Sequence, residues 1–175
     1  KKEVITLDGR ETAPLLVKED LFQDSNGNPL KFFDAVVGGK SVGTPGTPAL
    51  LEEAYKRWGK TKWSLLFKDA INLSNNGFVI SKKLSSSIKK SKSSLSKFLN
   101  TKTYFLPNDI PLKSGNIHYN KEYAETLKAF AKKGSKVFYQ GFLADDIVST
   151  VNNASINPGV LSLKDMNNYK VIQRE

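Results

Sequence analysis

Residues 37–59 form the stretch around which the chain is organised, and they read Val37-Gly-Gly-Lys-Ser-Val-Gly-Thr-Pro-Gly-Thr-Pro48 followed by Ala49-Leu-Leu-Glu-Glu-Ala-Tyr-Lys-Arg-Trp-Gly59. Glycines and prolines dominate the first half, so its backbone must turn tightly or adopt positive φ angles. In the second half, apolar residues recur at helical spacing on one face, at Leu51, Ala54, Tyr55 and Trp58. Thr47 is a candidate N-cap, Pro48 suits the first helical position, and Gly59 can end the helix. The stretch therefore predicts a rigid loop that leads into a helix.

Within this loop, Gly39-Lys40-Ser41 resembles the end of a Walker A phosphate-binding loop. The full motif needs a glycine five residues before Gly39, and the sequence has Asp34 there. The glycines and prolines from Gly43 to Pro48 would also break the helix that should follow. We therefore interpret the loop as a structural turn that seats a helix.

Composition bounds the class of protein. The 175 residues suit one domain, and a hydrophobic share of 39% is enough for a core. No run is long and apolar enough to suggest a membrane span, and no apolar segment of the signal-peptide type opens the chain. The absence of cysteine excludes disulfides and thiolate chemistry. The single histidine, His118, cannot form a multi-histidine metal site and is expected at the surface, so no metal site is expected.

The net charge of +10 is concentrated between Ser81 and Lys97, a stretch with six lysines and no acidic residue. Such a stretch could bind nucleic acid or anionic lipid as a basic helical module without catalytic activity. Nucleic-acid binders usually place aromatic or arginine side chains among the lysines, and this stretch has neither. A solvated, lysine-rich helix face is the favoured interpretation, and no nucleic-acid partner is expected.

Apolar periodicity and capping residues predict a mainly helical chain with short strands at its ends. The expected helices are Leu15–Phe22, Thr47–Trp58, Lys62–Asn75, one from Ser81 toward Leu99 with a break near Ser91, Asn120–Lys133, Ser135–Asn153, and a short one capped by Ser162 and Asp165. The expected strands are Lys1–Leu7 and Lys170–Glu175, the second without a partner. The predicted core contains Leu51, Tyr55, Trp58, Leu66, Phe67, Ala70, Leu127, Phe130 and Val148.

Several motifs, in order and at characteristic separations, resemble the large subunit of the γ-glutamyltranspeptidases (glutathione hydrolases). The most specific are Ser41-Val42-Gly43-Thr44-Pro45-Gly46, Tyr55-x-x-Trp58-Gly59, and Ala70-Ile71-x-Leu73-x-x-x-Gly77-Phe78-x-Ile80. Others are Asp8-Gly9-Arg10-Glu11-x-Ala13-Pro14, Phe138-Tyr139-x-Gly141, and Ser162-Leu163-x-Asp165-x-x-x-Tyr169. The resemblance covers nearly the whole chain and is weak only through Lys82–His118.

This resemblance implies a fold and an activity. Members of the family are made as one precursor with the N-terminal nucleophile hydrolase fold, in which helices cover two central sheets (αββα). The precursor cuts itself, and the threonine at the new N-terminus of the small subunit becomes the nucleophile. The enzyme then transfers γ-glutamyl groups, typically from glutathione, to an amino acid, a peptide or water, without a metal or organic cofactor. The resemblance also implies a periplasmic or extracellular location.

On this interpretation, residues 1–175 are a single partial domain, an internal segment of the large subunit, and the small catalytic subunit is absent. We expect the segment alone to be inactive, because the threonine nucleophile and its amine are missing. We also expect it to expose apolar surface. A related acylase of the same fold is the closest alternative.

Few residues suit a site. Asp145 and Asp146 are adjacent on a predicted helix, where neighbouring side chains diverge, so we expect two solvated carboxylates. Arg10 lies between a strand end and a proline, and a guanidinium there could present a planar fork to a carboxylate. Position alone favours an exposed or Glu11-paired arginine. The family resemblance implies that Arg10 binds the α-carboxylate of the γ-glutamyl substrate.

Overall fold

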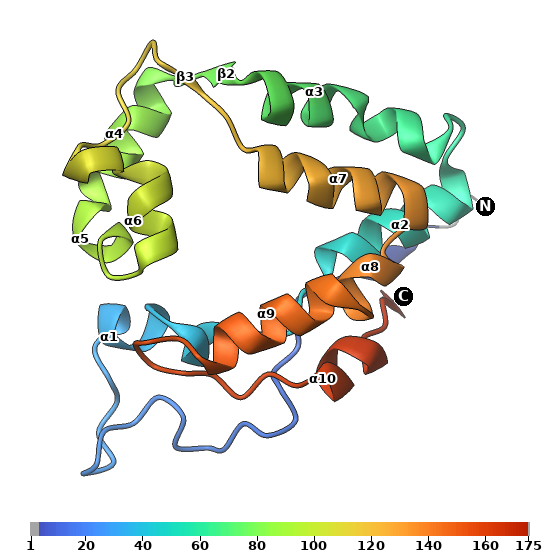
Figure 1. Ribbon diagram of the computed structural model, residues 1–175. Helices are drawn as coiled ribbons and strands as arrows, with labels where there is room; N and C mark the ends of the chain where they lie inside the picture. The colour runs from blue at the N-terminus through green and yellow to red at the C-terminus, as the bar shows by residue number, and fades with distance from the viewer. Residues whose placement is uncertain (1–3, 175) are drawn as a thin grey trace. The chain divides into compact units, whose positions relative to one another are not determined.

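The computed structural model describes residues 4–174, and this part of the chain is mainly helical, as the periodicity predicts (Figure 1). The helices are α1 (Phe32–Val36), α2 (Thr47–Trp58), α3 (Lys68–Asn76), α4 (Lys82–Lys90), α5 (Lys92–Leu95), α6 (Leu99–Phe105), α7 (Lys121–Lys133), α8 (Lys136–Tyr139), α9 (Phe142–Asn152) and α10 (Leu163–Asn168), with 3₁₀ turns η1 (Gly39–Ser41), η2 (Trp63–Phe67) and η3 (Pro107–Asp109). The strands are β1 (Thr6–Asp8), β2 (Phe78–Val79), β3 (Ile117–His118) and β4 (Ile172–Arg174). None of the helices formed by residues 4–174 is long and apolar enough to cross a membrane.

The strands form two antiparallel pairs, and one of them corrects a prediction. β1 pairs with β4 in the register Thr6↔Arg174, Leu7↔Gln173 and Asp8↔Ile172. The expectation that the last strand lacks a partner was therefore wrong, because the two ends of the chain pair with each other. Sequence periodicity can identify a strand, but it does not identify the strand's partner. β2 pairs with β3 through Phe78↔His118 and Val79↔Ile117.

The chain divides into two compact units. The first unit comprises residues 1–66 and 129–175, and the second comprises residues 67–128. In the first unit, Ala144, Val151, Leu161 and Met166 form a buried cluster against which Val148 packs. That unit carries Arg10, α2 and α8–α10. The expectation of one partial domain stays a prediction.

The second unit is built from short helices around its own buried residues, Ile80, Ile88, Leu106, Ala124 and Leu127. Its predicted caps are confirmed: the Leu84 amide donates to the Ser81 hydroxyl (3.1 Å), and the Tyr123 amide donates to Asn120 Oδ1 (2.9 Å). The predicted break at Ser91 is also present, between α4 and α5. These signals were readable because each involves residues close together in the sequence.

The loop at residues 37–46 is a structural turn, as interpreted. The Lys40 amide donates to the Asn157 carbonyl (2.8 Å), so it is not free to cradle a phosphate. Gly38 has φ 123°, a conformation that favours glycine. A Cβ on Gly39 would collide with the Val151 carbonyl. The glycines therefore let this loop pack directly against the end of α9.

The helix α2 has the predicted bounds but not the predicted cap. Thr47 is its first helical residue, Gly46 occupies the N-cap position, and no side-chain hydrogen bond caps the helix there. Instead, the Ala49 amide donates to the hydroxyl of Tyr139, 90 residues away (3.2 Å). The first backbone amides of a helix have no acceptor within the helix, and here the hydroxyl of a distant residue accepts from one of them.

Three other helix predictions need correction. The Lys62–Asn75 helix begins as the 3₁₀ turn η2 and becomes α-helical only at Lys68. The Ser135–Asn153 helix splits into α8 and α9, because Gly141 adopts φ 81°. The segment Leu15–Phe22 forms turns and no helix. Leu15 and Leu16 are exposed, so no apolar face is buried there to stabilise a short helix.

The predicted core is right in part. Leu127 and Phe130 are buried, and Tyr55, Phe67 and Val148 are half-buried. Leu51, Trp58, Leu66 and Ala70 are exposed, which contradicts the prediction. An amphipathic pattern identifies a face that can be buried, but the rest of residues 4–174 leaves about half of the Leu51, Trp58 and Leu66 surfaces exposed. The expectation of exposed apolar surface is confirmed at these positions.

Candidate functional site around Arg10

Arg10 lies two residues beyond β1, and the carboxylate of Asp8 fixes the turn between them. The Arg10 amide donates to Asp8 Oδ1 (3.0 Å), while Arg174 on the paired strand donates from Nε to Asp8 Oδ2 (2.7 Å). The hydrogen bond from the Arg10 amide, and then the Arg174 guanidinium, lower the pKa of Asp8. The β1–β4 pair and this ionised carboxylate therefore fix the position of the Arg10 amide.

Two stacked tyrosines hold the other side of the Arg10 peptide. The Tyr169 hydroxyl donates to the Arg10 carbonyl (2.7 Å). The Tyr169 ring stacks on Tyr139, with 5.6 Å between centroids and an interplanar angle of 7°. The Tyr139 hydroxyl donates to the Pro45 carbonyl (2.7 Å), and burial raises the pKa of Tyr139 to about 12. Burial also raises the pKa of Tyr169, so both hydroxyls remain protonated donors near neutral pH.

Glycines make this close approach possible. A Cβ on Gly46 would collide with both the Tyr169 hydroxyl and the Gly9 carbonyl. A Cβ on Gly9 would collide with the Leu50 side chain on α2. Because two backbones and a tyrosine hydroxyl meet here, only residues without a side chain fit at these two positions.

The segment after Arg10 is anchored as well. Thr12 and Thr44 form an antiparallel bridge, in which the Thr44 amide donates to the Thr12 carbonyl (2.9 Å). The Leu15 amide then donates to Asp165 Oδ1 (2.8 Å). Asp165 also forms the predicted capping box of α10 with Ser162. Burial tends to raise the pKa of Asp165, but the hydrogen bonds from Ser162 and the Leu15 amide outweigh it and lower that pKa.

The Arg10 side chain, in contrast to its backbone, lies in solvent. It is 80% exposed, and its Nη2 pairs with Glu11 Oε1 (2.8 Å), which is itself exposed. This pairing raises the pKa of Arg10 further, so the guanidinium is permanently charged. The exposed, Glu11-paired arginine that position alone favours is confirmed. A fixed backbone that carries an exposed planar cation can offer two parallel hydrogen bonds to a carboxylate.

A small apolar cavity of about 250 Å³ borders the Arg10 segment. Residues 11–14 form one wall and residues 40–43 the other, and Val17, Leu21 and Phe22 complete it. The loop at residues 37–46 therefore lies beside the segment that carries Arg10. This neighbourhood lies entirely within the first unit.

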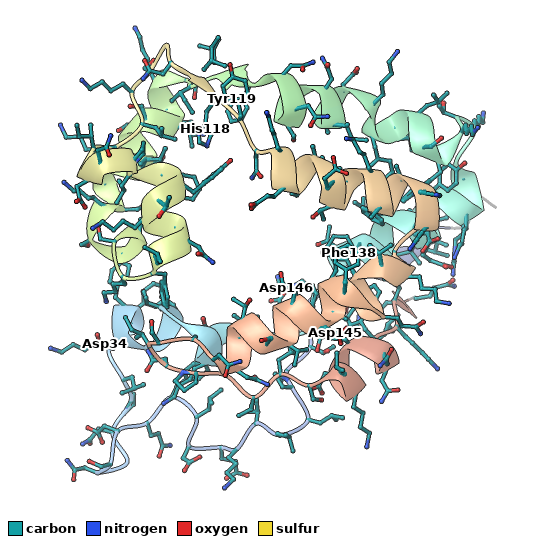
Figure 2. The ribbon with its side chains drawn as sticks, viewed as in Figure 1. Asp34, His118, Tyr119, Phe138, Asp145 and Asp146 are labelled. Atoms are coloured by element: carbon teal, nitrogen blue, oxygen red, sulfur yellow. The ribbon has the colours of Figure 1, made fainter. Side chains whose placement is uncertain are left out.

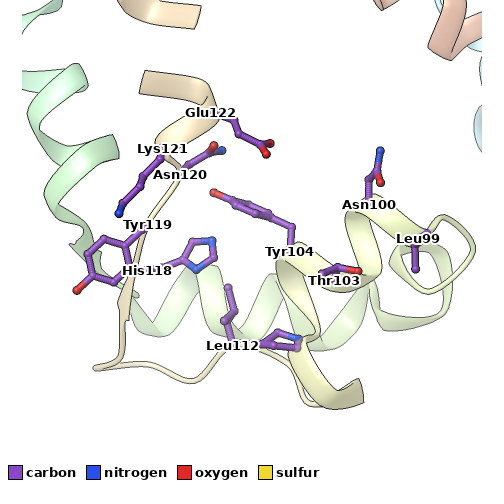
Figure 3. Close-up of a pocket in the computed structure, with 11 residues that line it drawn as sticks. Leu99, Asn100, Thr103, Tyr104, Leu112, His118, Tyr119, Asn120, Lys121 and Glu122 are labelled. Atoms are coloured by element: carbon purple, nitrogen blue, oxygen red, sulfur yellow. The ribbon is translucent and has the colours of Figure 1, made fainter. Parts of the chain in front are cut away.

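A larger, open cavity of about 700 Å³ lies within the second unit (Figure 3). Tyr104, His118, Asn120, Lys121 and Glu122 are among its lining residues. His118 packs between Phe78 and Tyr104, with ring centroids 6.0 and 4.4 Å away. The expectation of a surface histidine is therefore wrong in part, because its ring is half-buried and burial lowers its pKa.

The other sequence candidates carry no site. Asp145 and Asp146 are both exposed on α9, as predicted for solvated carboxylates (Figure 2). No group of three or more His, Cys, Asp or Glu residues among residues 4–174 could hold a metal ion.

Sequence reasoning identified Arg10 but missed the residues that position it. Asp8, Tyr139 and Tyr169 were visible only as members of motif segments. Asp165 was predicted as a helix cap, and its bond to the Leu15 amide was not anticipated. Residues far apart in the sequence thus contact one short segment, and no local sequence pattern predicts these contacts.

Comparison with known proteins identifies the family of this chain. The γ-glutamyltranspeptidase family model matches residues 1–175. The glutathione hydrolase proenzyme of Bacillus subtilis subsp. natto is 36% identical over 170 residues, which are 97% of this chain and 28% of that protein. The chain thus spans about a quarter of the length of this curated relative.

Solved structures give the same result. The γ-glutamyltranspeptidase of Helicobacter pylori is 31% identical with a TM-score of 0.91, over 99% of this chain and 49% of that one. The γ-glutamyltranspeptidase from Pseudomonas nitroreducens is 29% identical with a TM-score of 0.85, over 97% of this chain and 48% of that one. With its whole length matched by the family model, the chain belongs to the γ-glutamyltranspeptidase family.

Proposed function

We propose that the protein containing this chain is a γ-glutamyltransferase and glutathione hydrolase, and that Arg10 holds the α-carboxylate of its γ-glutamyl substrate. The names of the relatives support the activity, since the Bacillus subtilis subsp. natto and Arabidopsis thaliana relatives, which match over 97% and 94% of the chain, are named glutathione hydrolases. The observation that carries the role of Arg10 is the contrast within that residue: its backbone is bonded on both sides, and its guanidinium is exposed.

The proposed recognition step is an exchange of carboxylates. Glu11 is an exposed partner, and an exposed ion pair is held weakly. The substrate α-carboxylate takes its place and accepts two parallel hydrogen bonds from the Arg10 fork. Such a bidentate contact fixes the direction of the substrate, and the γ-carbonyl is thereby held before the nucleophile.

The chemistry itself requires a second chain. In the proposed enzyme, the hydroxyl of the small subunit's N-terminal threonine attacks the γ-carbonyl and gives its proton to the threonine's own α-amine, and the γ-amide bond of the donor breaks as its amine leaves with that proton. The resulting acyl-enzyme passes the glutamyl group to water, an amino acid or a peptide, without a metal or organic cofactor. The present chain supplies helices and edge strands of the αββα fold and the carboxylate clamp, and alone it is expected to be inactive. A periplasmic or extracellular location is part of this proposal.

The test separates recognition from maturation. Arg10→Lys keeps the charge but loses the planar fork, so in the full-length protein kcat/KM for a γ-glutamyl anilide should fall at least about tenfold. Autocleavage should be normal, because it does not use the substrate carboxylate. Arg57→Lys is the control for loss of a guanidinium elsewhere, since Arg57 bonds to Glu53 and to Gln173 Oε1 (2.7 Å) and has no proposed contact with the substrate. Normal maturation with an unchanged kcat/KM in Arg10→Lys would show that Arg10 is not the clamp.

A further inference from the structure

We infer that Tyr169 is a positioning residue for carboxylate recognition, because its hydroxyl fixes the Arg10 carbonyl and thereby the direction of the guanidinium. This inference rests on the proposed role of Arg10 and assigns a second residue to the same step. The hydroxyl donates to the Arg10 carbonyl across 159 positions of sequence, at 2.7 Å. Arg10 lies in an exposed turn, and such a turn needs external bonds to keep one conformation.

The need for Tyr169 follows from how Arg10 is held elsewhere. The Arg10 amide is bonded to Asp8, whose carboxylate Arg174 of the paired strand also holds, so this bond fixes the N-terminal side of Arg10. The side chain is bonded to Glu11, which is exposed and adjacent in sequence. The Tyr169 hydroxyl fixes the opposite side, the Arg10 carbonyl, and ties it to the end of α10.

Tyr169 is itself well held. Its amide donates to the Met166 carbonyl at the end of α10, and Met166 is fully buried. Its ring stacks on Tyr139, whose hydroxyl is bonded to the Pro45 carbonyl and the Ala49 amide. A continuous set of packed groups therefore runs from the buried cluster of the first unit to the Arg10 carbonyl.

Gly46 completes the geometry. A Cβ there would collide with the Tyr169 hydroxyl, so glycine at position 46 leaves the space that this hydroxyl needs to reach the Arg10 carbonyl. Removing the hydroxyl alone, as in Tyr169→Phe, keeps the ring stack and the charge of Arg10. The substitution removes only the restraint on the Arg10 peptide. KM should therefore rise only for substrates whose α-carboxylate binds the guanidinium.

The experiment compares two acyl-donor substrates of the full-length protein. One is a γ-glutamyl anilide, and the other is the 4-aminobutyryl anilide, which has the same acyl chain without the α-carboxylate. For Tyr169→Phe we expect KM for the γ-glutamyl anilide to rise about three- to tenfold, the range that one neutral hydrogen bond supports, with kcat nearly unchanged. The kcat/KM for the 4-aminobutyryl anilide should be unchanged. Tyr123→Phe, at an exposed tyrosine of the second unit, is the matched control and should alter neither donor.

The outcomes distinguish this inference from the proposed function. If Arg10→Lys impairs the γ-glutamyl donor and Tyr169→Phe does not, Tyr169 has no positioning role and the clamp stands. Equal losses on both donors in Tyr169→Phe would show a merely structural role and would also overturn the inference. If Arg10→Lys itself changes nothing, the clamp fails and the inference fails with it. All rates are expressed per mole of matured enzyme, so reduced maturation of a variant does not obscure the comparison.

Discussion

The two units of this chain are stabilised in different ways. In the first unit, bonds between residues more than 100 positions apart hold the exposed segments, as between Leu15 and Asp165 or Arg10 and Tyr169. In the second unit, most side-chain bonds reach nearby backbone, as at Ser81 and Asn120, and the bond from Ser85 to the Leu112 carbonyl spans only 27 residues. The second unit also carries eleven lysines against four acidic residues. Long-range anchoring is therefore characteristic of the unit that carries the candidate site, and local capping of the other unit.

The family resemblance follows this division only in part, because the motif at residues 70–80 lies in the second unit. It is weak from Lys82 to His118, a stretch that lies wholly in the second unit. Its motifs at residues 8–14, 41–46, 138–141 and 162–169 all lie in the first unit and meet around Arg10. The motifs thus include the residues that place one guanidinium, and their spacing in sequence gives no hint of this proximity.

The largest expected effect concerns the buried aromatic cluster of the first unit. Phe130 is 6% exposed, and its ring lies 5.4 Å from Trp63 and 5.1 Å from Phe138. Phe130→Ala should therefore lower the free energy of unfolding by about 3–5 kcal/mol, measured by urea denaturation of this chain. Leu66 is 55% exposed, so Leu66→Ala should change that free energy by no more than about 0.5 kcal/mol.

This pair of variants also tests the burial pattern. A loss at Leu66 as large as that at Phe130 would mean that the apolar face of η2 is covered in solution. Self-association of the chain would be the first explanation to examine, by comparing unfolding at several protein concentrations, because burial between copies makes stability depend on concentration.

The second expected effect concerns Asp165, which joins α10 to the segment after Arg10. Asp165→Asn replaces the carboxylate oxygen that accepts from the part-buried Ser162 amide and hydroxyl, so unfolding free energy at pH 7 should fall by about 1–3 kcal/mol. Asp145→Asn, at an exposed carboxylate of α9, is the control and should have no measurable effect.

The pH dependence of this effect has a defined sign. Because the folded-state pKa of Asp165 lies below its ordinary value of 3.8, its stabilising contribution is complete above that pH. The contribution is lost as the pH falls through the folded-state pKa. The difference between Asp165→Asn and the unmodified chain should therefore shrink between pH 4 and lower values, in urea titrations at each pH. A difference that stays constant would mean that the carboxylate charge plays no part.

Sequence reasoning succeeded where the cause is local. The bounds of Thr47–Trp58 and the cap at Ser81 follow from residues within one or two helical turns. The exposure of Arg10 was also predictable, since it follows a strand end and precedes a proline. The exposure of Leu51 and Leu66 was not predictable, because periodicity defines a face and says nothing of what covers it. Nor was the bond from Tyr169 to Arg10, which depends on how distant segments pack.

The third effect concerns a local cap in the second unit. Ser81→Ala removes the acceptor of the Leu84 amide at the start of α4, so unfolding free energy should fall by about 1 kcal/mol. Ser87→Ala, at an exposed position within the same helix, should have no cost or a slight gain, because alanine is the better helix former. Equal effects at the two positions would show that the cap does not define the start of α4.

The smallest effect concerns the lysines of α4, whose influence should depend on their place along the helix. Lys83 lies in the first turn, where the positive end of the helix dipole disfavours a cation, and Lys90 lies in the last turn, where a cation is favoured. Lys83→Gln should therefore raise the free energy of unfolding by roughly 0.3–0.5 kcal/mol, and Lys90→Gln should lower it by a similar amount. Both differences should vanish in about 1 M salt, where the Debye length is only about 3 Å. If the two changes in unfolding free energy have opposite signs and disappear in high salt, these lysines are solvated and act through the dipole of their own helix.

Changes of equal sign at both positions would instead indicate that the lysines of the second unit repel one another. The contrast between the two units would then rest on net charge.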